Sequence, residues 1–295
     1  MSGASTIDIA DASSGKTHRD ENFPVASVLI APRHRAPILA FYDFVRAADD
    51  IADHPTLGPA DKLALLDRLE AALLGQGPDE PAAARLRTIL LERGLSPQHA
   101  RDLLTAFRRD VTQLRYKDWG DLIDYCRYSA MPVGRFVLDV HGENADATWA
   151  ANDALCAALQ IINHLQDCGK DYRDLDRVYL PLETLNAFGA GVEMLALPKA
   201  PEPLRAALKA LAARTGELLA QSRPFADRIA DTRLAMEVGA IQSLAEMLTT
   251  RLAAADPLSE KVHASKAQFL CYSALGAGAA LLRRLGRREK AGGAA

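Results

Sequence analysis

The segment 147–168, ATWAANDALCAALQIINHLQDC, constrains the fold most, because its apolar residues cover most of a helical surface. A helix that is hydrophobic on nearly all sides is stable only when other elements bury it, so we expect it at the centre of the protein. Leucine recurs at helical spacing in PADKLALLDRLEAALLG, which ends on the glycine typical of a helix terminus. Alternating strand patterns are nearly absent, and only residues 177–181, RVYLP, look extended. The pattern predicts an all-α fold of about eight to ten helices.

The domain organisation is simple. No repeat of the length found in solenoid proteins is visible, so a single packed domain is the economical interpretation. We expect one all-α domain over residues 20–285, preceded by a disordered lead-in over 1–19 and followed by a flexible basic tail over 286–295. Proline favours the first turn of a helix, because its missing N–H is not needed there. The prolines at expected helix starts are Pro81, Pro97, Pro203 and Pro257.

The composition excludes several classes of protein. Of the 295 residues, 49% are apolar and 25% are charged, which is typical of a soluble globular chain. The formal net charge is −3 and only 6% of residues are aromatic, so neither a basic field nor a stacking platform for nucleic acid is expected. The four cysteines form no CxxC pair, and the N-terminal stretch has no apolar signal-peptide core. These features predict buried thiols in a reducing cytoplasm.

Two ladders of oxygen-bearing side chains lie inside apolar helical segments. Residues four apart share a helix face, so most members of each ladder point in one direction. Carboxylates at this spacing repel one another, which suggests a compensating ligand; a solvated helix face or an exposed helix end is the alternative. Mg²⁺ prefers hard oxygen ligands and often uses one or two carboxylates together with substrate phosphates. The candidate metal ligands are Asp49, Asp50 and Asp53 in DDIAD, and Asn163, Asp167 and Asp171 in NHLQDCGKD.

The segment DYCRYSAMPVGRF lies between the two ladders in the sequence. Pro132 inside its helical pattern predicts a kink or a break. The small residues Ser129 and Gly134 favour close approach of a backbone or a ligand, and the Arg127 and Tyr128 side chains could face a cavity. An ordinary kinked helix with a satisfied tyrosine is the alternative.

Other motifs exclude or weaken further chemistries. The sequence has no GxSxG, P-loop or GxGxxG motif, so nothing predicts a nicotinamide or ATP site. His164 follows Asn163 directly and therefore points about 100° away from the second ladder. We expect it to be a packed group rather than a metal ligand.

The longest apolar run, residues 269–282, is shorter than the roughly 20 residues that a membrane-spanning helix needs. Five basic residues follow it, at Arg283, Arg284, Arg287, Arg288 and Lys290. A core helix with a solvated basic tail is the simplest interpretation. A peripheral contact with an anionic membrane is the alternative, since basic clusters are drawn to such surfaces.

These motifs together resemble the squalene/phytoene synthase family of trans head-to-head prenyl synthases. The resemblance covers about residues 20–285 and rests on DDIAD, YCRYSAMPVG and NHLQDCGKD in the family's order and spacing. Within the family, ENFPVAS, CRYSAMPVGR and FRRDVTQLRYKDW look most like the bacterial hydroxysqualene synthases of hopanoid biosynthesis. The resemblance implies an all-α isoprenoid-synthase fold around a central apolar cavity.

The resemblance also implies roles for individual residues. Both ladders would hold Mg²⁺ ions that bridge the substrate diphosphate, and Arg46 and Arg177 match basic residues that contact this diphosphate. Tyr128 matches the tyrosine of the central motif. The catalytic candidates are Asp49, Asp53, Asp167, Asp171 and Tyr128. The candidates for the substrate cavity are Phe23, Tyr42, Arg127, Ser129, Met131, Gly134 and Gln160.

Two departures from the family's pattern bear on the substrate. The chain has DENFPVAS where relatives commonly carry Ser-x-x-Phe, and Ser129-Ala130-Met131 where many carry Val-Ala-Gly. These differences favour a later intermediate over the condensation of two farnesyl diphosphates. The resemblance therefore implies a Mg²⁺-dependent hydroxysqualene synthase, which converts presqualene diphosphate and water to hydroxysqualene and pyrophosphate without NADPH.

Three alternatives stay open from the sequence. The first is a presqualene diphosphate, squalene or phytoene synthase, which condenses two prenyl diphosphates. The others are a non-catalytic assembly factor of the same family and an isoprenoid-binding protein. In every case we expect a cytoplasmic protein, with loose association to enzymes of the same pathway and peripheral membrane contact as further partners.

Overall fold

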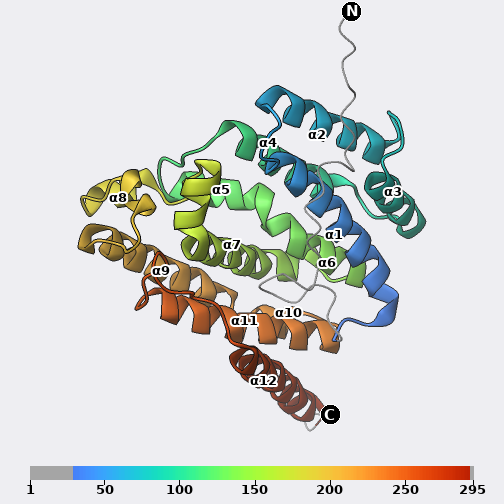
Figure 1. Cartoon of the computed structure of the whole chain (residues 1–295). Helices are drawn as coiled ribbons and strands as arrows, with labels where there is room; N and C mark the ends of the chain where they lie inside the picture. Colours follow the sequence, from blue (N-terminus) through green and yellow to red (C-terminus); the bar gives the residue numbers. More distant parts are fainter. Residues whose placement is uncertain (1–28, 293–295) are drawn as a thin grey trace, which may run out of the picture.

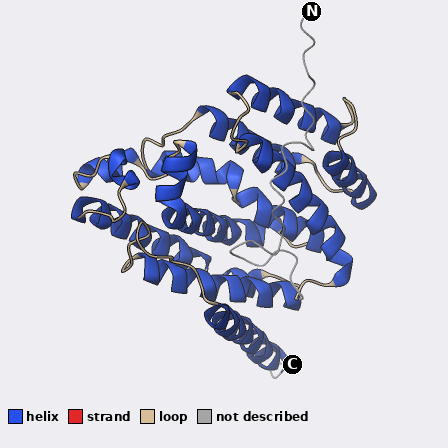
Figure 2. Cartoon of the chain, in the orientation of Figure 1, coloured by secondary structure: helices blue, strands red, loops and turns tan. Residues whose placement is uncertain are grey.

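The computed structural model describes residues 29–292, and side chains as far as residue 287. Within this range all regular structure is helical, apart from one isolated β-bridge between Arg115 and Val178 (Figure 2). The predicted all-α fold is therefore confirmed. The helices are α1 (Pro32–Ala52), α2 (Pro59–Leu74), α3 (Pro81–Arg93), α4 (Gln98–Thr112), α5 (Trp119–Ser129), α6 (Met131–His141), α7 (Ala145–Leu175), α8 (Leu182–Ala187), the 3₁₀ helix η2 (Val192–Ala196), α9 (Glu202–Ser222), α10 (Phe225–Arg228), α11 (Thr232–Leu252) and α12 (Lys266–Gly292).

Helix α7 is the central element of the fold, as its apolar surface predicts. It packs against α5, α6, α9 and α11, while α1 packs against α2, α3, α4 and α6. Figure 1 shows α1–α4 on one side of α7 and α9 with α11 on the other, with α12 outermost. The predicted lead-in over 1–19 lies outside the described residues.

The ends of α7 follow from local chemistry. The Asn144 side chain accepts a hydrogen bond from the Ala147 backbone N–H and caps the first turn. Asp176 ends the helix in the left-handed conformation, with φ 51°. Near this end Gly169 allows close packing, because a Cβ there would lie 2.5 Å from a Leu258 methyl carbon. A long helix thus carries the second ladder to the middle of the molecule.

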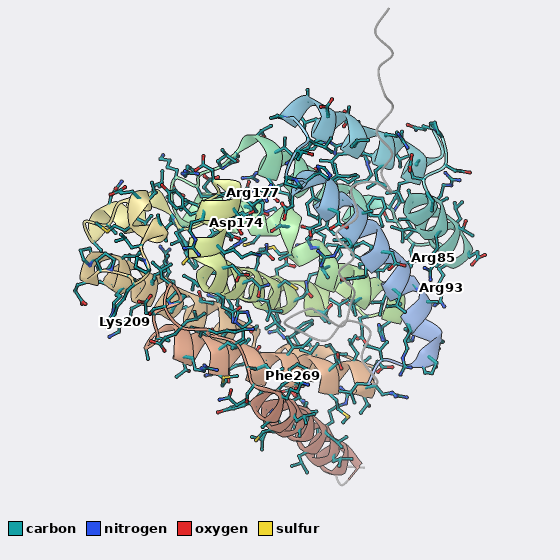
Figure 3. All side chains as sticks on the ribbon, viewed as in Figure 1. Arg85, Arg93, Asp174, Arg177, Lys209 and Phe269 are labelled. Carbon is teal, nitrogen blue, oxygen red and sulfur yellow. The ribbon has the colours of Figure 1, made fainter. Side chains whose placement is uncertain are left out.

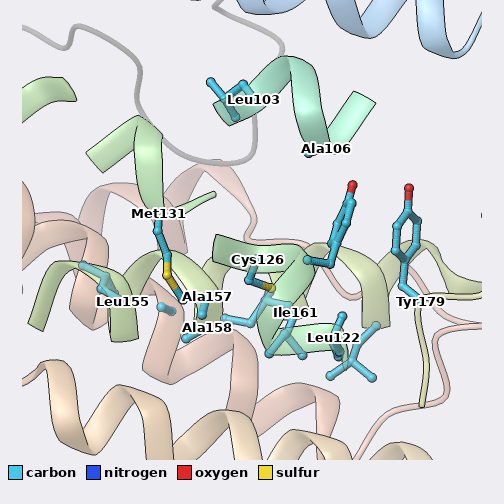
Figure 4. Packing of buried hydrophobic residues seen from close by; sticks show 14 of the residues in the cluster. Leu103, Ala106, Leu122, Cys126, Met131, Leu155, Ala157, Ala158, Ile161 and Tyr179 are labelled. Atoms are coloured by element: carbon cyan, nitrogen blue, oxygen red, sulfur yellow. The ribbon is translucent and has the colours of Figure 1, made fainter. Parts of the chain in front are cut away.

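Pro132 separates α5 from α6, as predicted. Helix α5 ends at Ser129, and Pro132 stands in the first turn of α6. Gly134 then brings α6 against α7, since a Cβ at this position would lie 2.0 Å from the Asn152 Oδ1 atom. Figure 4 shows the buried side chains of Met131 and Leu155 packed between these helices.

Most of the prolines stand where the sequence predicts helix starts, and one does not. Pro81 and Pro203 occupy the first turns of α3 and α9, and Pro97 directly precedes α4. The prediction of a helix start at Pro257 is wrong. The preceding Asp256 is buried and its carboxylate accepts hydrogen bonds from the Ala200 and Leu258 backbone N–H groups, which fixes a turn instead.

The prediction that residues 269–282 form a core helix is also wrong. Helix α12 lies at the periphery and packs on α11, where a Cβ on Gly276 would lie 2.0 Å from the Gly239 carbonyl oxygen. The opposite face is exposed, because small residues rather than leucines fill the contact with α11. The exposed leucines are Leu270, Leu275, Leu282 and Leu285. Helix α12 continues to Gly292, through much of the segment assigned to a tail. None of the described helices combines the length and the hydrophobicity of a membrane-spanning segment.

Candidate active site

A polar pocket of about 390 Å³ lies where α1, α4, α5 and α7 meet the segment 175–179. Each ladder contributes to it from its own helix, so residues far apart in the sequence face one cavity. Five of the six candidate metal ligands line the polar pocket: Asp49, Asp53, Asn163, Asp167 and Asp171. The sixth, Asp50, is buried and does not line this pocket, because the residue after Asp49 points to another side of α1.

The first ladder ends α1. Asp53 is the C-terminal cap of this helix, and its backbone N–H donates to the Asp49 carbonyl oxygen. One turn earlier, Arg46 donates a hydrogen bond of 2.6 Å to the Asp49 carboxylate and lies 5.8 Å from the centre of the Tyr42 ring. All four side chains line the polar pocket. Arg46 therefore supplies positive charge beside the first ladder, in the position that the sequence indicates.

Arg177 connects the two ladders. The left-handed turn at Asp176 brings the chain back along α7, and the Arg177 backbone N–H donates to the Asp171 carbonyl oxygen. The buried Arg177 guanidinium, 6% exposed, donates to Asp53 Oδ1 at 2.5 Å and to the Ala52 carbonyl oxygen at 3.1 Å. Figure 3 labels Arg177 and Asp174 at this C-terminal end of α7. The cation thus lies at the edge of the polar pocket with its geometry fixed.

The carboxylates of the polar pocket carry more negative charge than the two arginines offset. Loss of hydration and the neighbouring Asp53 carboxylate raise the pKa of Asp49 from 3.8 to about 7. Loss of hydration, followed by the charges of Asp167 and Asp53, raises the pKa of Asp171 from 3.8 to about 7. The effect of Asp53 on Asp171 is a mutual repulsion between the ladders. A site with these pKa values favours binding of additional cations.

The donor set fits Mg²⁺. Among the described residues no group of three acidic, His or Cys side chains converges as a preformed metal cage. Each ladder instead presents two pocket-facing carboxylates, from Asp49 and Asp53 on one side and Asp167 and Asp171 on the other. Mg²⁺ usually takes one or two carboxylates and completes its shell with waters and substrate phosphates. This arrangement suits ions that are held between protein and ligand.

Sequence reasoning missed a buried hydrogen-bond network of Asp110, Tyr125 and Tyr179, which also lines the polar pocket. Asp110 on α4 is buried and accepts hydrogen bonds of 2.8 Å from Tyr125 and 2.9 Å from Tyr179. Burial raises the pKa of Asp110 to about 6 and those of both tyrosines well above 10.0. His164 stacks on Tyr179 with ring centres 3.6 Å apart, and burial lowers the pKa of His164 to about 3. His164 is therefore a packed neutral ring, as expected, although it also lines the polar pocket.

The tyrosine of the central motif that faces the polar pocket is Tyr125 and not Tyr128. Three positions separate them, and the turn of α5 directs Tyr125 inward to Asp110, whereas Tyr128 lines neither this pocket nor the neighbouring apolar cavity. Arg127 is exposed and lies 3.7 Å from an Asp124 carboxylate oxygen, which also differs from the predicted cavity position. A signal that could have identified Asp110 and Tyr125 is helical spacing from buried apolar positions, since Asp110 follows Leu103 and Ala106 on one helix and Tyr125 follows Leu122 on the next.

The remaining cavity candidates divide between two spaces. Ser129 and Gln160 line the polar pocket, Gly134 lines the adjoining apolar cavity, and Tyr42 lines both. Met131 is buried, and its carbonyl oxygen accepts a hydrogen bond from Asn152, but it lines neither space. Phe23 lies outside the described residues.

The apolar cavity, of about 280 Å³, adjoins the polar pocket. The two spaces share the lining residues Tyr42, Val45, Val133 and Asn163. Beyond this junction the walls come from α1, α6, α7, α10 and α11 and are mainly aliphatic and aromatic. A molecule with an anionic head and a long apolar chain would fill both spaces, with its head between the ladders.

Comparisons with known proteins agree with this geometry. The family model described as squalene/phytoene synthase matches residues 16–268. The chain is 61% identical to a hydroxysqualene synthase of Rhodopseudomonas palustris, over 88% of this chain and 89% of that protein. It is 56% identical to a hydroxysqualene synthase of Sinorhizobium fredii, over 86% of this chain and 87% of that protein.

A solved structure shares the fold. The squalene synthase of Alicyclobacillus acidocaldarius superposes with a TM-score of 0.70 at 29% identity, over 83% of this chain and 91% of that one. The match of the family model and the identity to these relatives extend over most of the chain. The polar pocket with its two ladders, and the helices that carry them, therefore belong to a member of the squalene/phytoene synthase family.

Proposed function

We propose that this protein is a hydroxysqualene synthase, which converts presqualene diphosphate and water to hydroxysqualene and pyrophosphate. The observation that carries the proposal is the junction of a pocket lined by the four ladder aspartates with an apolar cavity. The identity of 61% to a protein with this activity supports the choice within the family. The substrate has the matching form, a charged diphosphate on a long hydrocarbon.

The diphosphate would bind between the ladders. Asp49, Asp53, Asp167 and Asp171 would hold Mg²⁺, which neutralises the diphosphate and favours its departure as pyrophosphate. Arg46 and Arg177 would contact the diphosphate oxygens directly, after exchange of part of their contacts with the aspartates. Held by these side chains, the diphosphate would place the breaking C–O bond at the junction with the apolar cavity.

The hydrocarbon cation that remains would then rearrange within the apolar cavity. Its apolar walls, with the hydrocarbon filling the cavity, would keep bulk water from capturing the cation too early. Tyr125 and Tyr179 stay protonated because their pKa values are raised and their hydroxyls donate to Asp110, so they present neutral aromatic rings to the polar pocket, where the cation would first form. Such rings stabilise a nearby cation without reacting with it. Water finally captures the rearranged cation, so the reaction needs no hydride donor.

One reaction tests the proposal. Purified protein is incubated with presqualene diphosphate and Mg²⁺ in the absence of NADPH, and the products are identified by mass spectrometry. We expect hydroxysqualene and an equal amount of pyrophosphate. Consumption of farnesyl or geranylgeranyl diphosphate in parallel reactions, without turnover of presqualene diphosphate, would instead assign a synthase of the condensing type.

The non-catalytic alternatives fit the site less well. An assembly factor or an isoprenoid-binding protein does not need four pocket-facing aspartates, and these repel one another without a cation. The exposed leucines of α12 support a peripheral membrane contact of the enzyme, while Arg283 and Arg287 at the end of the helix pair with Asp227. Sedimentation with anionic vesicles, compared with neutral ones, tests that contact.

A further inference from the structure

A third space adjoins the apolar cavity, on the outer side of α11. This outer groove, of about 710 Å³, is formed by side chains within residues 222–227, 238–246 and 275–283, which belong to the end of α9 and to α10, α11 and α12. Figure 1 shows α10, α11 and α12 side by side. Val238 of α11 lines the outer groove and also the apolar cavity. At this point the two spaces are therefore separated by one side chain.

The short helix α10 also contributes to the wall between these spaces. Phe225 faces the apolar cavity, while the adjacent Pro224 and Ala226 line the outer groove. Phe225 and Val238 are only 3% and 6% exposed, so the wall is closed in this structure. A hydrocarbon could pass from one space to the other only if α10 shifts.

Three arginines of α12 bind α10 and the residues that follow it. Arg283 donates to Asp227 Oδ1 at 3.1 Å, and Arg287 pairs with the same carboxylate. Arg284 donates to the carbonyl oxygens of residues 229–230 at 2.5 and 2.6 Å. The Arg283 and Arg287 side chains are 47% and 51% exposed, so water screens their ion pairs and the pairs stabilise the closed wall only weakly. The basic end of α12 therefore holds α10 by contacts that open at low cost in free energy.

The chemistry of the outer groove favours a neutral ligand. Its four charged side chains pair with one another: Arg223 donates to Glu246 at 2.9 Å, and Arg283 donates to Asp227. The charges offset each other within these pairs, so the groove does not select an ion. The groove also presents apolar surface, including Leu275, which is 61% exposed. Burial of such a side chain against hydrocarbon is favourable.

The polar pocket and the outer groove would thus serve different species. The substrate carries a diphosphate, which would lose its hydration in an apolar space, so we expect it to enter through the polar pocket. The product is a neutral hydrocarbon alcohol, which the ladders no longer hold. Leu282 lies two turns beyond Leu275 on the same face of α12, so exposed apolar surface continues from the groove along the helix.

We propose that the outer groove is a second hydrocarbon site, through which the product leaves the apolar cavity for a lipid phase when α10 shifts. This role rests on the proposed function and adds the route of product release to it.

The test separates the chemical step from product release. Ala279 lines the outer groove and is exposed, so Ala279→Trp fills the groove without entering the apolar cavity. Enzyme in excess converts presqualene diphosphate in a single turnover, and vesicles of neutral phosphatidylcholine are then added to take up hydroxysqualene. We expect pyrophosphate to form at the rate of the unmodified protein, whereas transfer of hydroxysqualene to the vesicles should be at least about fivefold slower. In steady state the variant should release a burst of about one pyrophosphate per active site before slower turnover.

Ala274→Trp is the matched control, because Ala274 is an exposed residue of α12 that does not line the outer groove. We expect it to transfer hydroxysqualene as fast as the unmodified protein. The role of the groove is refuted if Ala279→Trp transfers the product at the unmodified rate, if Ala274→Trp slows transfer equally, or if pyrophosphate formation slows in proportion. Should Ala279→Trp not fold, Ala279→Phe carries the same test with the same outcomes.

The unmodified protein separates the two proposals. If it forms no hydroxysqualene, the proposed function fails. If it forms hydroxysqualene and Ala279→Trp leaves the transfer rate unaltered, only the role of the outer groove is refuted.

Discussion

Arg177 donates a hydrogen bond to Asp53 although 124 positions separate them in the sequence. This contact ties the segment after α7 to the end of α1, and so it fixes the distance between the two aspartate ladders. The same guanidinium donates to the carbonyl oxygens of Ala52 and Asp110. One side chain therefore joins three of the elements that form the polar pocket, namely α1, α4 and the segment after α7.

Loss of this cation will disturb both stability and activity. Arg177→Met leaves Asp53 beside the other ladder without its partner. Because the Asp53 side chain is 40% exposed, the cost should be smaller than the about 3–5 kcal/mol typical of a fully buried pair. We expect a clear drop in Tm and a loss of turnover of at least about a hundredfold. Arg115→Met is the control, because Arg115 pairs with the exposed Asp176 and should change Tm little. Equal effects of the two changes would contradict the assigned role of Arg177.

Removal of a ladder carboxylate will abolish Mg²⁺-dependent turnover. In Asp49→Ala and Asp167→Ala we expect kcat to fall at least about a hundredfold, because the charge that holds the cations is incomplete. Asp43→Ala serves as a control on the same helix, since Asp43 faces outward and pairs with Arg85. Assays over a range of Mg²⁺ concentrations measure the effect. Near-normal turnover in either ladder variant would exclude a cation bridge between the ladders.

The raised pKa values predict how stability depends on pH. Asp49 has a pKa of about 7 in the folded protein and 3.8 as a reference, so the folded state binds more protons between these values. The free energy of unfolding contributed by this group therefore falls as the pH rises from about 4 to 7 and stays low above that. Asp49→Asn removes this pH-dependent contribution to the free energy of unfolding. In Mg²⁺-free buffer we therefore expect the variant to be more stable than the unmodified protein at pH 8. We expect a smaller difference at pH 5.

Chemical denaturation of both proteins at the two pH values measures this difference. The comparison cancels the contribution of His164, whose pKa is lowered to about 3 and which stabilises the fold as the pH rises toward 6.5. Added Mg²⁺ should raise the stability of the unmodified protein more at pH 8 than at pH 5. A constant difference between variant and unmodified protein across this range would refute the linkage.

The two tyrosines of the central motif will behave differently. Tyr125→Phe removes one of the hydrogen bonds to the buried Asp110 carboxylate, which we expect to cost about 1–3 kcal/mol of stability and to slow turnover. Tyr128→Phe should change stability by less than about 0.5 kcal/mol and leave turnover near normal. Thermal melts and initial rates distinguish the two. The reverse order would restore Tyr128 to the role that the resemblance implied.

Gly134 will not tolerate a side chain. A Cβ at this position would lie 2.0 Å from Asn152 Oδ1 and 2.7 Å from the Cys156 sulfur, so Gly134→Ala should push α6 from α7 and cost about 1–3 kcal/mol. Gly216 in α9 is the control, because nothing lies within 4 Å of a Cβ there. Gly216→Ala should stabilise its helix by up to about 1 kcal/mol. Urea denaturation of both variants measures the contrast.

Much of the fold could be predicted because it depends on local patterns. Apolar periodicity predicts α7 as the buried centre, and Pro132 predicts the break between α5 and α6. The ladders could be found for a similar reason, since i and i+4 positions share a face on any helix. The residues that were missed or misplaced depend on tertiary contacts. Whether Tyr125 or Tyr128 turns inward is decided by Asp110 on another helix, and α12 lies outside because its small residues, not its leucines, meet α11.

The close contact of α11 with α12 also limits how this chain can change over time. A Cβ on Gly239 would lie 2.6 Å from the Gly276 carbonyl oxygen, and a Cβ on Gly276 would lie 2.0 Å from the Gly239 carbonyl oxygen. Neither position can accept even alanine unless the two backbones move apart. The two glycines therefore constrain each other, because a substitution at one that moves the backbones apart also removes the steric requirement for glycine at the other. In a related protein that lacks both glycines, α12 could pack at a different position. We therefore expect the contact between α11 and α12 in relatives that keep glycine at both sites.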